Sequence, residues 1–220
     1  MIEEGSIGPM TNARAGSITV YYDYTCRYSY RALHWLDLAR EARPELEVRW
    51  ATFSLKEVNR DPEEQPWVMA TSPPSVSVFA LALAHAAREG DFDRYHRTVF
   101  EAMHGEERKI GDEELLRFAG DAGVDPEIAA SDRGRWVGSV GGEHRDAVAR
   151  LGVYGTPTII QGDSGTYLRL HEVPSSPDAA IGLLDALAGL AASTADLVEL
   201  FRSGGLKPTP VPIEGPGRGL

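Results

Sequence analysis

The sequence predicts an α/β protein in which two β-rich parts share one mixed sheet and a block of helices is inserted between them. Three observations predict this arrangement. A strand, a helix and a strand follow one another near the N-terminus, helical patterns then continue to about Leu151, and strand patterns return only after Pro157. A strand–helix–strand unit places two parallel strands in one sheet, and the later strands complete that sheet.

The first β-rich part begins with Ile18–Tyr22, a β-branched and aromatic run typical of a buried strand. From Cys26 onward the apolar residues recur at helical spacing, until residues 41–44 end the helix with a proline. Residues 46–50 then alternate apolar with charged side chains, which indicates a strand with one wetter face.

The middle of the chain opens with an irregular, proline-rich passage over residues 62–74 and continues as helices. Asp112 and the pair Asp125-Pro126 each begin a helix. The clearest helix carries apolar or aromatic side chains at positions i, i+3, i+4, i+7, i+8 and i+11, namely Phe92, Tyr95, His96, Val99, Phe100 and Met103.

Strand patterns return at residues 158–161 and 167–170, with a hairpin turn expected over residues 162–165. A helix is expected from Ser176-Pro177-Asp178 to about Ala192, and a short one begins at Thr194. We therefore expect a disordered N-terminus (1–16), a βαβ half (17–60), a helical insertion (61–151), a ββα half (152–203) and a Pro/Gly-rich tail (204–220).

The amino-acid composition excludes several classes of partner and of binding site. The 220 residues are 42% hydrophobic and carry a net charge of −11, so the chain can bury a full core but repels phosphates. We expect no nucleic-acid partner and no membrane, since the apolar stretches are too short for a span. The single cysteine excludes an internal disulfide and a multi-cysteine metal site, and no metal is expected. A free thiol without a recognisable export signal predicts a cytoplasmic protein.

The single cysteine, Cys26, lies between the end of a strand and the start of a helix. The unpaired N–H groups at a helix N-terminus stabilise a thiolate, and Arg27 adds a nearby cation. The Ser29 hydroxyl can donate a hydrogen bond to the sulfur. Asp23 is either a base near the thiol or a turn former. The alternative for Cys26 is an inert buried thiol.

Two motifs resemble the DsbA-like thioredoxin family. Residues 21–26 (YYDYTC) resemble the aromatic Tyr-Asp segment that leads into the family's Cys-x-x-Cys, and residues 152–158 (GVYGTPT) resemble its Gly-Val-x-Gly-Thr-Pro-Thr landmark. Weaker similarity lies at residues 53–60 and 100–103, and the whole resemblance covers about residues 17–192. It implies a thioredoxin-like fold with an inserted all-helical subdomain.

The resemblance also implies the site residues. Cys26 is the nucleophile, and Ser29 is its hydrogen-bond partner. A cis Thr156–Pro157 bond lies against the thiol, and the Thr156 backbone pairs with an extended substrate. The residues expected to line the mouth are Tyr24, Arg27 and Tyr28. From the residues alone, Pro157 is equally a strand opener.

The motif departs from the family at Ser29, which stands where the second cysteine is usual, giving Cys-Arg-Tyr-Ser. A serine cannot resolve a mixed disulfide, so a dithiol mechanism is excluded. The Tyr28-Ser29 pair is similar to the end of Ser-Pro-Tyr-Ser in kappa-class glutathione transferases and chromene-carboxylate isomerases.

The site residues and the family resemblance are compatible with three alternative functions. The first is a monothiol thiol-disulfide oxidoreductase that acts through Cys26 on a thiol, disulfide or small-molecule substrate. Its co-substrate is a small thiol, glutathione or a bacterial equivalent, and no cofactor stays bound. The second is a glutathione-dependent isomerase or transferase of kappa-class type. The third is a redox-inactive thioredoxin-like binding module. The sequence leaves the natural substrate and the oligomeric state open.

Overall fold

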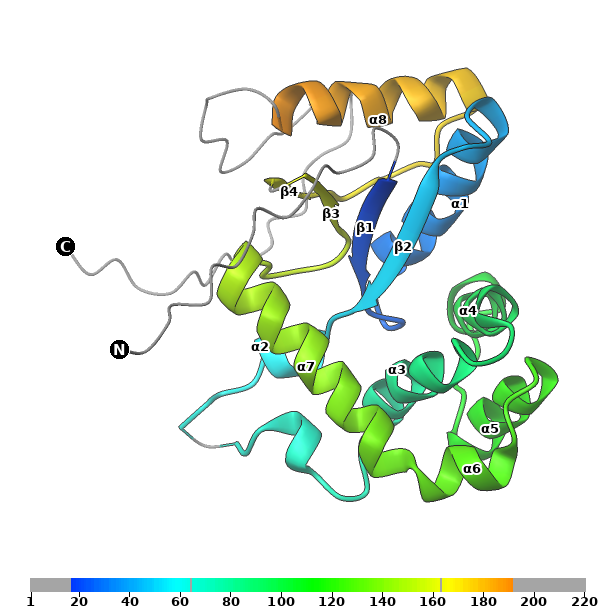
Figure 1. Ribbon diagram of the computed structural model, residues 1–220, viewed down its shortest axis with the longest axis vertical. Coiled ribbons are helices and arrows are strands. Elements are labelled where there is room, and N and C mark those ends of the chain that lie inside the picture. Colours follow the sequence, from blue (N-terminus) through cyan, green and yellow to red (C-terminus); the bar gives the residue numbers. More distant parts are fainter. Residues whose placement is uncertain (1–16, 64, 163, 192–220) are drawn as a thin grey trace, which may run out of the picture.

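The computed structural model describes residues 17–191 apart from Glu64 and Asp163 (Figure 1). Its centre is a four-stranded mixed sheet in the order β2-β1-β3-β4. The strands are β1 (Ser17–Tyr22), β2 (Glu47–Thr52), β3 (Thr158–Gln161) and β4 (Ser164–Tyr167). β1 runs parallel to β2 and antiparallel to β3, and β3 runs antiparallel to β4. The mixed sheet expected from the sequence is confirmed.

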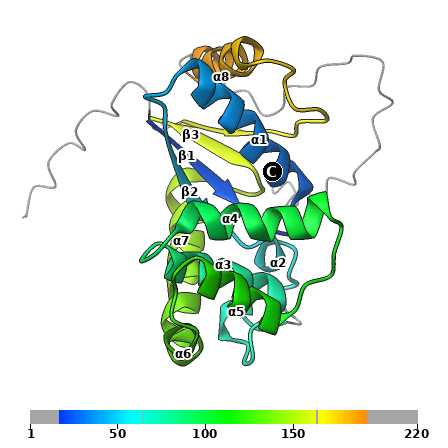
Figure 2. The same ribbon diagram turned by 90° about the vertical axis from the view of Figure 1, so that its right-hand side faces the viewer.

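Helices α1 (Arg27–Ala42) and α8 (Pro177–Ala191) cover one face of this sheet (Figures 1 and 2). Alternate residues of β1 point to that face, and Val20 and Tyr22 are fully buried there. The two helices also contact each other, and the indole N–H of Trp35 donates to the carbonyl oxygen of Ala180 at 2.8 Å. The buried indole therefore has its hydrogen bond and fixes α8 onto α1.

The other face of the sheet packs against the C-terminal part of α7 (Arg133–Leu151). Tyr21, Ala51 and Ile160 form a small apolar cluster there with Ala147. α7 ends at Gly152, whose φ of 62° lies in the left-handed region that glycine adopts without strain. Val153, the next residue, begins the loop that leads back to the sheet.

The remaining helices form a block at the far end of the molecule from α8, joined to the sheet by α7 (Figure 1). The most buried of them is α3, whose alanines and leucines contact α4, α5 and α7. The block and its approach comprise α2 (Leu55–Val58), η1 (Val68–Ala70), α3 (Val76–Ala87), α4 (Phe92–Phe100), the π-helical turn η2 (Glu101–Gly105), α5 (Asp112–Asp121) and α6 (Pro126–Ser131).

Two boundaries differ from the prediction. The expected helix through Met103 is α-helical only to Phe100 and continues as the π-helical turn η2. The last strand is Ser164–Tyr167, three residues earlier than expected, because Gln161 already pairs with Ser164 across a tight turn. Gly162, with φ of 61°, supplies the left-handed backbone of that turn. The helix expected at Thr194 and the two terminal segments lie outside the described residues.

A polar cluster centred on Glu143 of α7 joins the helical block to the end of β2. One Glu143 carboxylate oxygen accepts from the Thr52 backbone N–H at 2.6 Å and from its hydroxyl at 2.8 Å. Arg88 of α3 donates to the other oxygen at 3.0 Å, and the Thr52 hydroxyl also contacts the His85 ring at 2.9 Å. Arg49 completes the set of charges around this carboxylate.

The titration of this cluster makes stability depend on pH. Burial, with the charges of Arg88 and Arg49, lowers the pKa of His85 from 6.5 to about 4 despite Glu143. Burial alone raises the pKa of Glu143, but hydrogen bonds and charge from Arg88, with the charge of His85, outweigh it and lower that pKa. The unfolded chain thus binds more protons than the folded one below pH 6.5, so acid destabilises the fold.

We expect Glu143→Gln to unfold more readily at pH 7 by about 2 kcal/mol, because it loses charged hydrogen bonds to Arg88 and Arg49. The difference from wild type should shrink as the pH falls through the lowered pKa of Glu143. Urea denaturation at several pH values measures both effects. Glu127→Gln, an exposed change on α6, is the control. A Glu143→Gln deficit that stays constant down to pH 3 would contradict this account.

Candidate active site

Cys26 caps the N-terminus of α1, directly after the loop that leaves β1. Its Sγ lies 3.2 Å from the carbonyl oxygen of Thr156, which is 130 residues further along the chain. The Thr156–Pro157 peptide bond is cis, and β3 begins at the next residue. The fold therefore brings the two sequence motifs together, with the thiol donating to the loop that precedes β3.

Asp23 shapes the loop before the thiol. Its Oδ1 accepts from the backbone N–H and the hydroxyl of Thr25 at 2.8 and 2.7 Å, and its Oδ2 accepts from the Leu55 N–H at 2.8 Å. Burial raises the pKa of Asp23, and these hydrogen bonds oppose the rise. The Cys26 N–H donates to the Asp23 carbonyl at 3.0 Å. With both carboxylate oxygens engaged, Asp23 is a turn former, and the alternative of a base is not supported.

Tyr24 does not line the mouth of the site, which corrects the expectation from the sequence. Its side chain is fully buried, and its hydroxyl lies 3.1 Å from Nδ1 of His96 in α4. Its ring packs edge-on against Phe100 with the centroids 4.9 Å apart. The Tyr24 side chain instead anchors the active-site loop in the helical block.

The expected hydrogen bond from Ser29 to the sulfur is also absent. Ser29 is fully buried in the first turn of α1, and its hydroxyl has no hydrogen-bond partner among the described residues. The Thr156 hydroxyl is likewise buried without a partner in the described part of the chain. The Cys26 thiol donates to the Thr156 carbonyl instead.

The other expected site residues surround Cys26. Arg27, the first residue of α1, is exposed, and Tyr28 is half-buried. Thr156 and Pro157 are buried, and the Pro157 carbonyl accepts from the Leu168 N–H at 3.0 Å. This bond extends the β3–β4 pairing back to the loop beside the thiol.

The sequence did not single out Tyr167 and Arg169, which the structure adds to the site. Tyr167 pairs with Thr158, and its ring lies over Gly155, where a Cβ would come within 3.0 Å of Cε2. The Arg169 Nε donates to the Tyr167 hydroxyl. Only the correct register of β4 brings these side chains beside Thr156. The tight turn between Gln161 and Ser164 sets this register, so recognising that turn in the sequence would have identified both residues.

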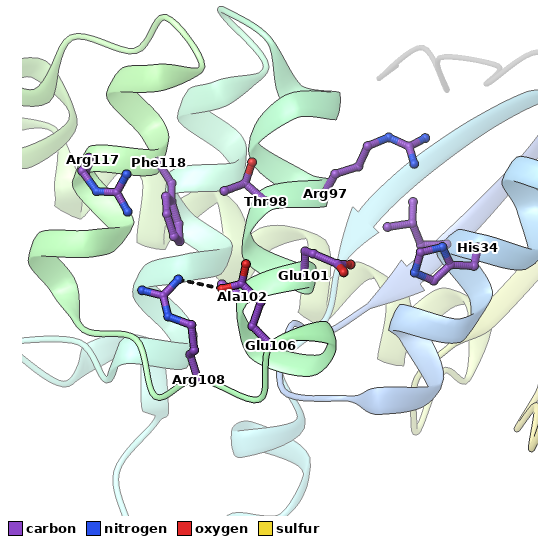
Figure 3. Close-up of a pocket in the computed structure, with 10 residues that line it drawn as sticks. His34, Arg97, Thr98, Glu101, Ala102, Glu106, Arg108, Arg117 and Phe118 are labelled. Atoms are coloured by element: carbon purple, nitrogen blue, oxygen red, sulfur yellow. Dashed lines mark hydrogen bonds and ion pairs between the residues drawn. The ribbon is translucent and has the colours of Figure 1, made fainter.

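A cavity of about 540 Å³ lies elsewhere, between α1 and the helical block (Figure 3). Figure 3 shows His34 of α1 across from Arg97, Thr98 and Glu101 of the α4–η2 segment. None of its lining residues belongs to the Cys26 loop or to the Pro157 loop. Its arginines already pair with carboxylates, as Arg97 does with Asp37. It is therefore separate from the thiol site.

Two further observations concern the described part of the chain as a whole. Its His, Cys, Asp and Glu side chains form no group of three that could hold a metal ion. None of its helices combines the length and the apolar character that crossing a membrane requires.

Comparisons with known proteins show which folds the chain is similar to. A probable DsbA oxidoreductase from Streptomyces coelicolor superposes with a TM-score of 0.57 at 19% identity, covering 84% of this chain and 93% of that one. The cytosolic disulfide reductase DsbM from Pseudomonas aeruginosa, solved with GSH, gives 0.55 at 19%, covering 79% and 99%. A 2-hydroxychromene-2-carboxylate isomerase gives 0.56 at 17%, covering 79% and 95%. The search of curated proteins found no match.

These likenesses establish a thioredoxin-like α/β fold with a helical insertion, as the resemblance in the sequence implied. The profile of the DSBA-like thioredoxin domain matches residues 17–176. That match includes the Cys26 loop, the whole helical block and the loop containing Pro157. The chain therefore belongs to the DSBA-like thioredoxin domain family.

Proposed function

We propose that the protein is a monothiol thiol-disulfide oxidoreductase with Cys26 as its nucleophile and a small thiol as its co-substrate. The observation that carries the proposal is the position of the only cysteine, at the N-terminus of α1 and 3.2 Å from the Thr156 carbonyl. The first backbone N–H groups of a helix have no partner within the helix, and the loop before β3 offers backbone groups to an extended substrate.

In the first half-reaction Cys26 loses its proton to solvent and attacks one sulfur of a mixed disulfide between the substrate and the small thiol. A new bond forms between Cys26 Sγ and the sulfur of the small thiol, while the old S–S bond breaks. The substrate leaves as a thiolate and takes up a proton. The Ser29 and Thr156 hydroxyls are buried and have no hydrogen-bond partner among the described residues.

In the second half-reaction another molecule of the small thiol attacks the sulfur bound to Cys26. The products are the oxidised small-thiol dimer and the Cys26 thiolate. The small thiol thus supplies both electrons, and the substrate disulfide is reduced. An external thiol is required because position 29 is a serine. DsbM, a reductase of the same fold solved with GSH, is consistent with this co-substrate.

A glutathione-dependent isomerase or transferase is the second candidate. It is favoured by the Tyr28-Ser29 pair and by the likeness to a 2-hydroxychromene-2-carboxylate isomerase. In that reaction the protein orients the thiolate of the small thiol toward a carbon electrophile, and Cys26 forms no disulfide.

The test is to incubate the protein with a glutathionylated peptide and reduced glutathione, while following peptide release and the mass of the protein. We expect catalytic release and a transient glutathione adduct on Cys26. Thioether formation with a carbon electrophile, without such an adduct, would favour the second candidate. Peptide binding without either reaction would indicate a redox-inactive binding module. A free thiol in turnover suits a reducing compartment, and we propose the cytoplasm.

A further inference from the structure

A group of arginines and tyrosines lies on one side of Cys26. The Tyr28 ring has two guanidinium carbons near its centroid, that of Arg31 at 5.7 Å and that of Arg169 at 5.5 Å. Arg169 also lies 5.2 Å from the centroid of Tyr167, to whose hydroxyl its Nε donates. Arg31 is fixed by a 2.9 Å hydrogen bond to the Leu170 carbonyl. Two aromatic rings thus hold Arg169 in place.

This group belongs to the thiol site. Tyr28 follows Cys26 by two residues, and Tyr167 packs over Gly155, next to Thr156. Both tyrosines contact the Arg169 guanidinium, which places this cation among the residues next to Cys26 and Thr156.

The arginines of this group have no carboxylate partner among the described residues, unlike Arg88, which pairs with Glu143, and Arg97, which pairs with Asp37. Neither Arg31 nor Arg169 forms an ion pair with any residue that the structure describes, and the exposed Arg27 adds a third such cation at the mouth. In a chain of net charge −11 this is a local concentration of uncompensated positive charge beside the nucleophile.

We propose that Arg169 and Arg31, positioned by Tyr28 and Tyr167, bind a carboxylate of the small-thiol co-substrate, an inference that rests on the proposed function. The Nε of Arg169 donates to the Tyr167 hydroxyl, and its two Nη groups remain to donate to the two oxygens of a carboxylate in the two-bond geometry that guanidinium favours. The co-substrate class is therefore a short, peptide-like thiol with a free carboxylate, rather than a neutral or cationic thiol.

The experiment compares three small symmetrical disulfides that differ mainly in charge: 3,3′-dithiodipropionate (anionic), bis(2-hydroxyethyl) disulfide (neutral) and cystamine (cationic). The rate of single-turnover adduct formation on Cys26 is measured by mass spectrometry. At 0.15 M salt, long-range repulsion from the acidic surface is screened, whereas a contact with arginine persists. We expect the wild type to react about tenfold faster with the anionic disulfide than with the cationic one.

Arg169→Gln should reduce the ratio of the anionic to the neutral rate by about fivefold, and Arg169→Lys should have an intermediate effect because it keeps the charge but loses the two-bond geometry. Arg40→Gln is the matched control. It removes a charge from α1, about 20 Å from Cys26, and should leave the ratio unchanged.

One outcome would overturn the inference: a ratio of the anionic to the neutral rate that Arg169→Gln leaves unchanged. If both rates fall equally while the ratio stays the same, Arg169 acts only on the thiolate. A wild-type protein that forms an adduct with none of the three disulfides would instead refute the proposed function. The two failures are therefore distinguishable.

Discussion

Cys26→Ser should reduce the release of thiol from a glutathionylated peptide to the uncatalysed rate, a loss of at least about 10³-fold. A hydroxyl cannot form the S–S bond on which both half-reactions depend. The fold should remain intact, because serine is slightly smaller than cysteine and can still donate to the Thr156 carbonyl. In the wild type this carbonyl accepts from Cys26 Sγ at 3.2 Å. A coupled glutathione assay measures the rate, and circular dichroism with thermal unfolding confirms the fold.

The same variant separates the candidate functions. If the protein orients a small-thiol thiolate toward a carbon electrophile, a hydroxyl at position 26 can still donate a hydrogen bond to that thiolate, and conjugation should persist. Disulfide exchange that persists in Cys26→Ser would contradict the monothiol mechanism, since the chain has no other cysteine. Ser131→Ala, an exposed change on α6, provides the control for handling and stability.

Much of the fold could be predicted because local signals and the hydrophobic pattern agree. The β-branched and aromatic run of β1 and the helical spacing of α1 are strong signals, and the Asp125-Pro126 pair caps α6 as expected. The last strand was misplaced because its sequence, Ser164–Tyr167, carries few apolar residues. Its position is set by pairing with β3 across a tight turn rather than by its own pattern.

The site was predicted less completely, for a related reason. Cys26, Thr156 and Pro157 lie in local motifs, whereas Tyr167 and Arg169 reach the thiol only through the register of β4. For Tyr24 the prediction was wrong. The residue was expected to line the mouth of the site, but its side chain contacts Phe100 and His96 of the helical block. Tertiary contacts across distant segments carry no local signal in a single sequence.

Ser29→Cys should convert the monothiol site into a dithiol one. Position 29 lies one helical turn from Cys26, and its N–H donates to the Cys26 carbonyl at 3.0 Å. One turn places the two Cα atoms within the range that a disulfide spans. The Ser29 hydroxyl has no partner among the described residues, so a thiol in its place gives up no hydrogen bond.

The effect should appear in the lifetime of the glutathione adduct on Cys26 when no free thiol is present. In the wild type the adduct should persist, because only an external thiol can attack it. In Ser29→Cys the neighbouring thiol attacks within the molecule, and the lifetime should fall by at least about 10²-fold, with glutathione released and an internal disulfide formed. Mass spectrometry of quenched samples follows both species.

Ser131→Cys is the matched control, since it adds the same thiol to the surface of α6 in the helical block rather than to the first turn of α1. Its adduct should last as long as that of the wild type, apart from slow exchange between molecules that dilution removes. An equally long-lived adduct in Ser29→Cys would mean that the two sulfur atoms cannot meet at the start of α1. The missing cysteine would then not be the reason for a monothiol mechanism, because the first turn itself would prevent a dithiol one.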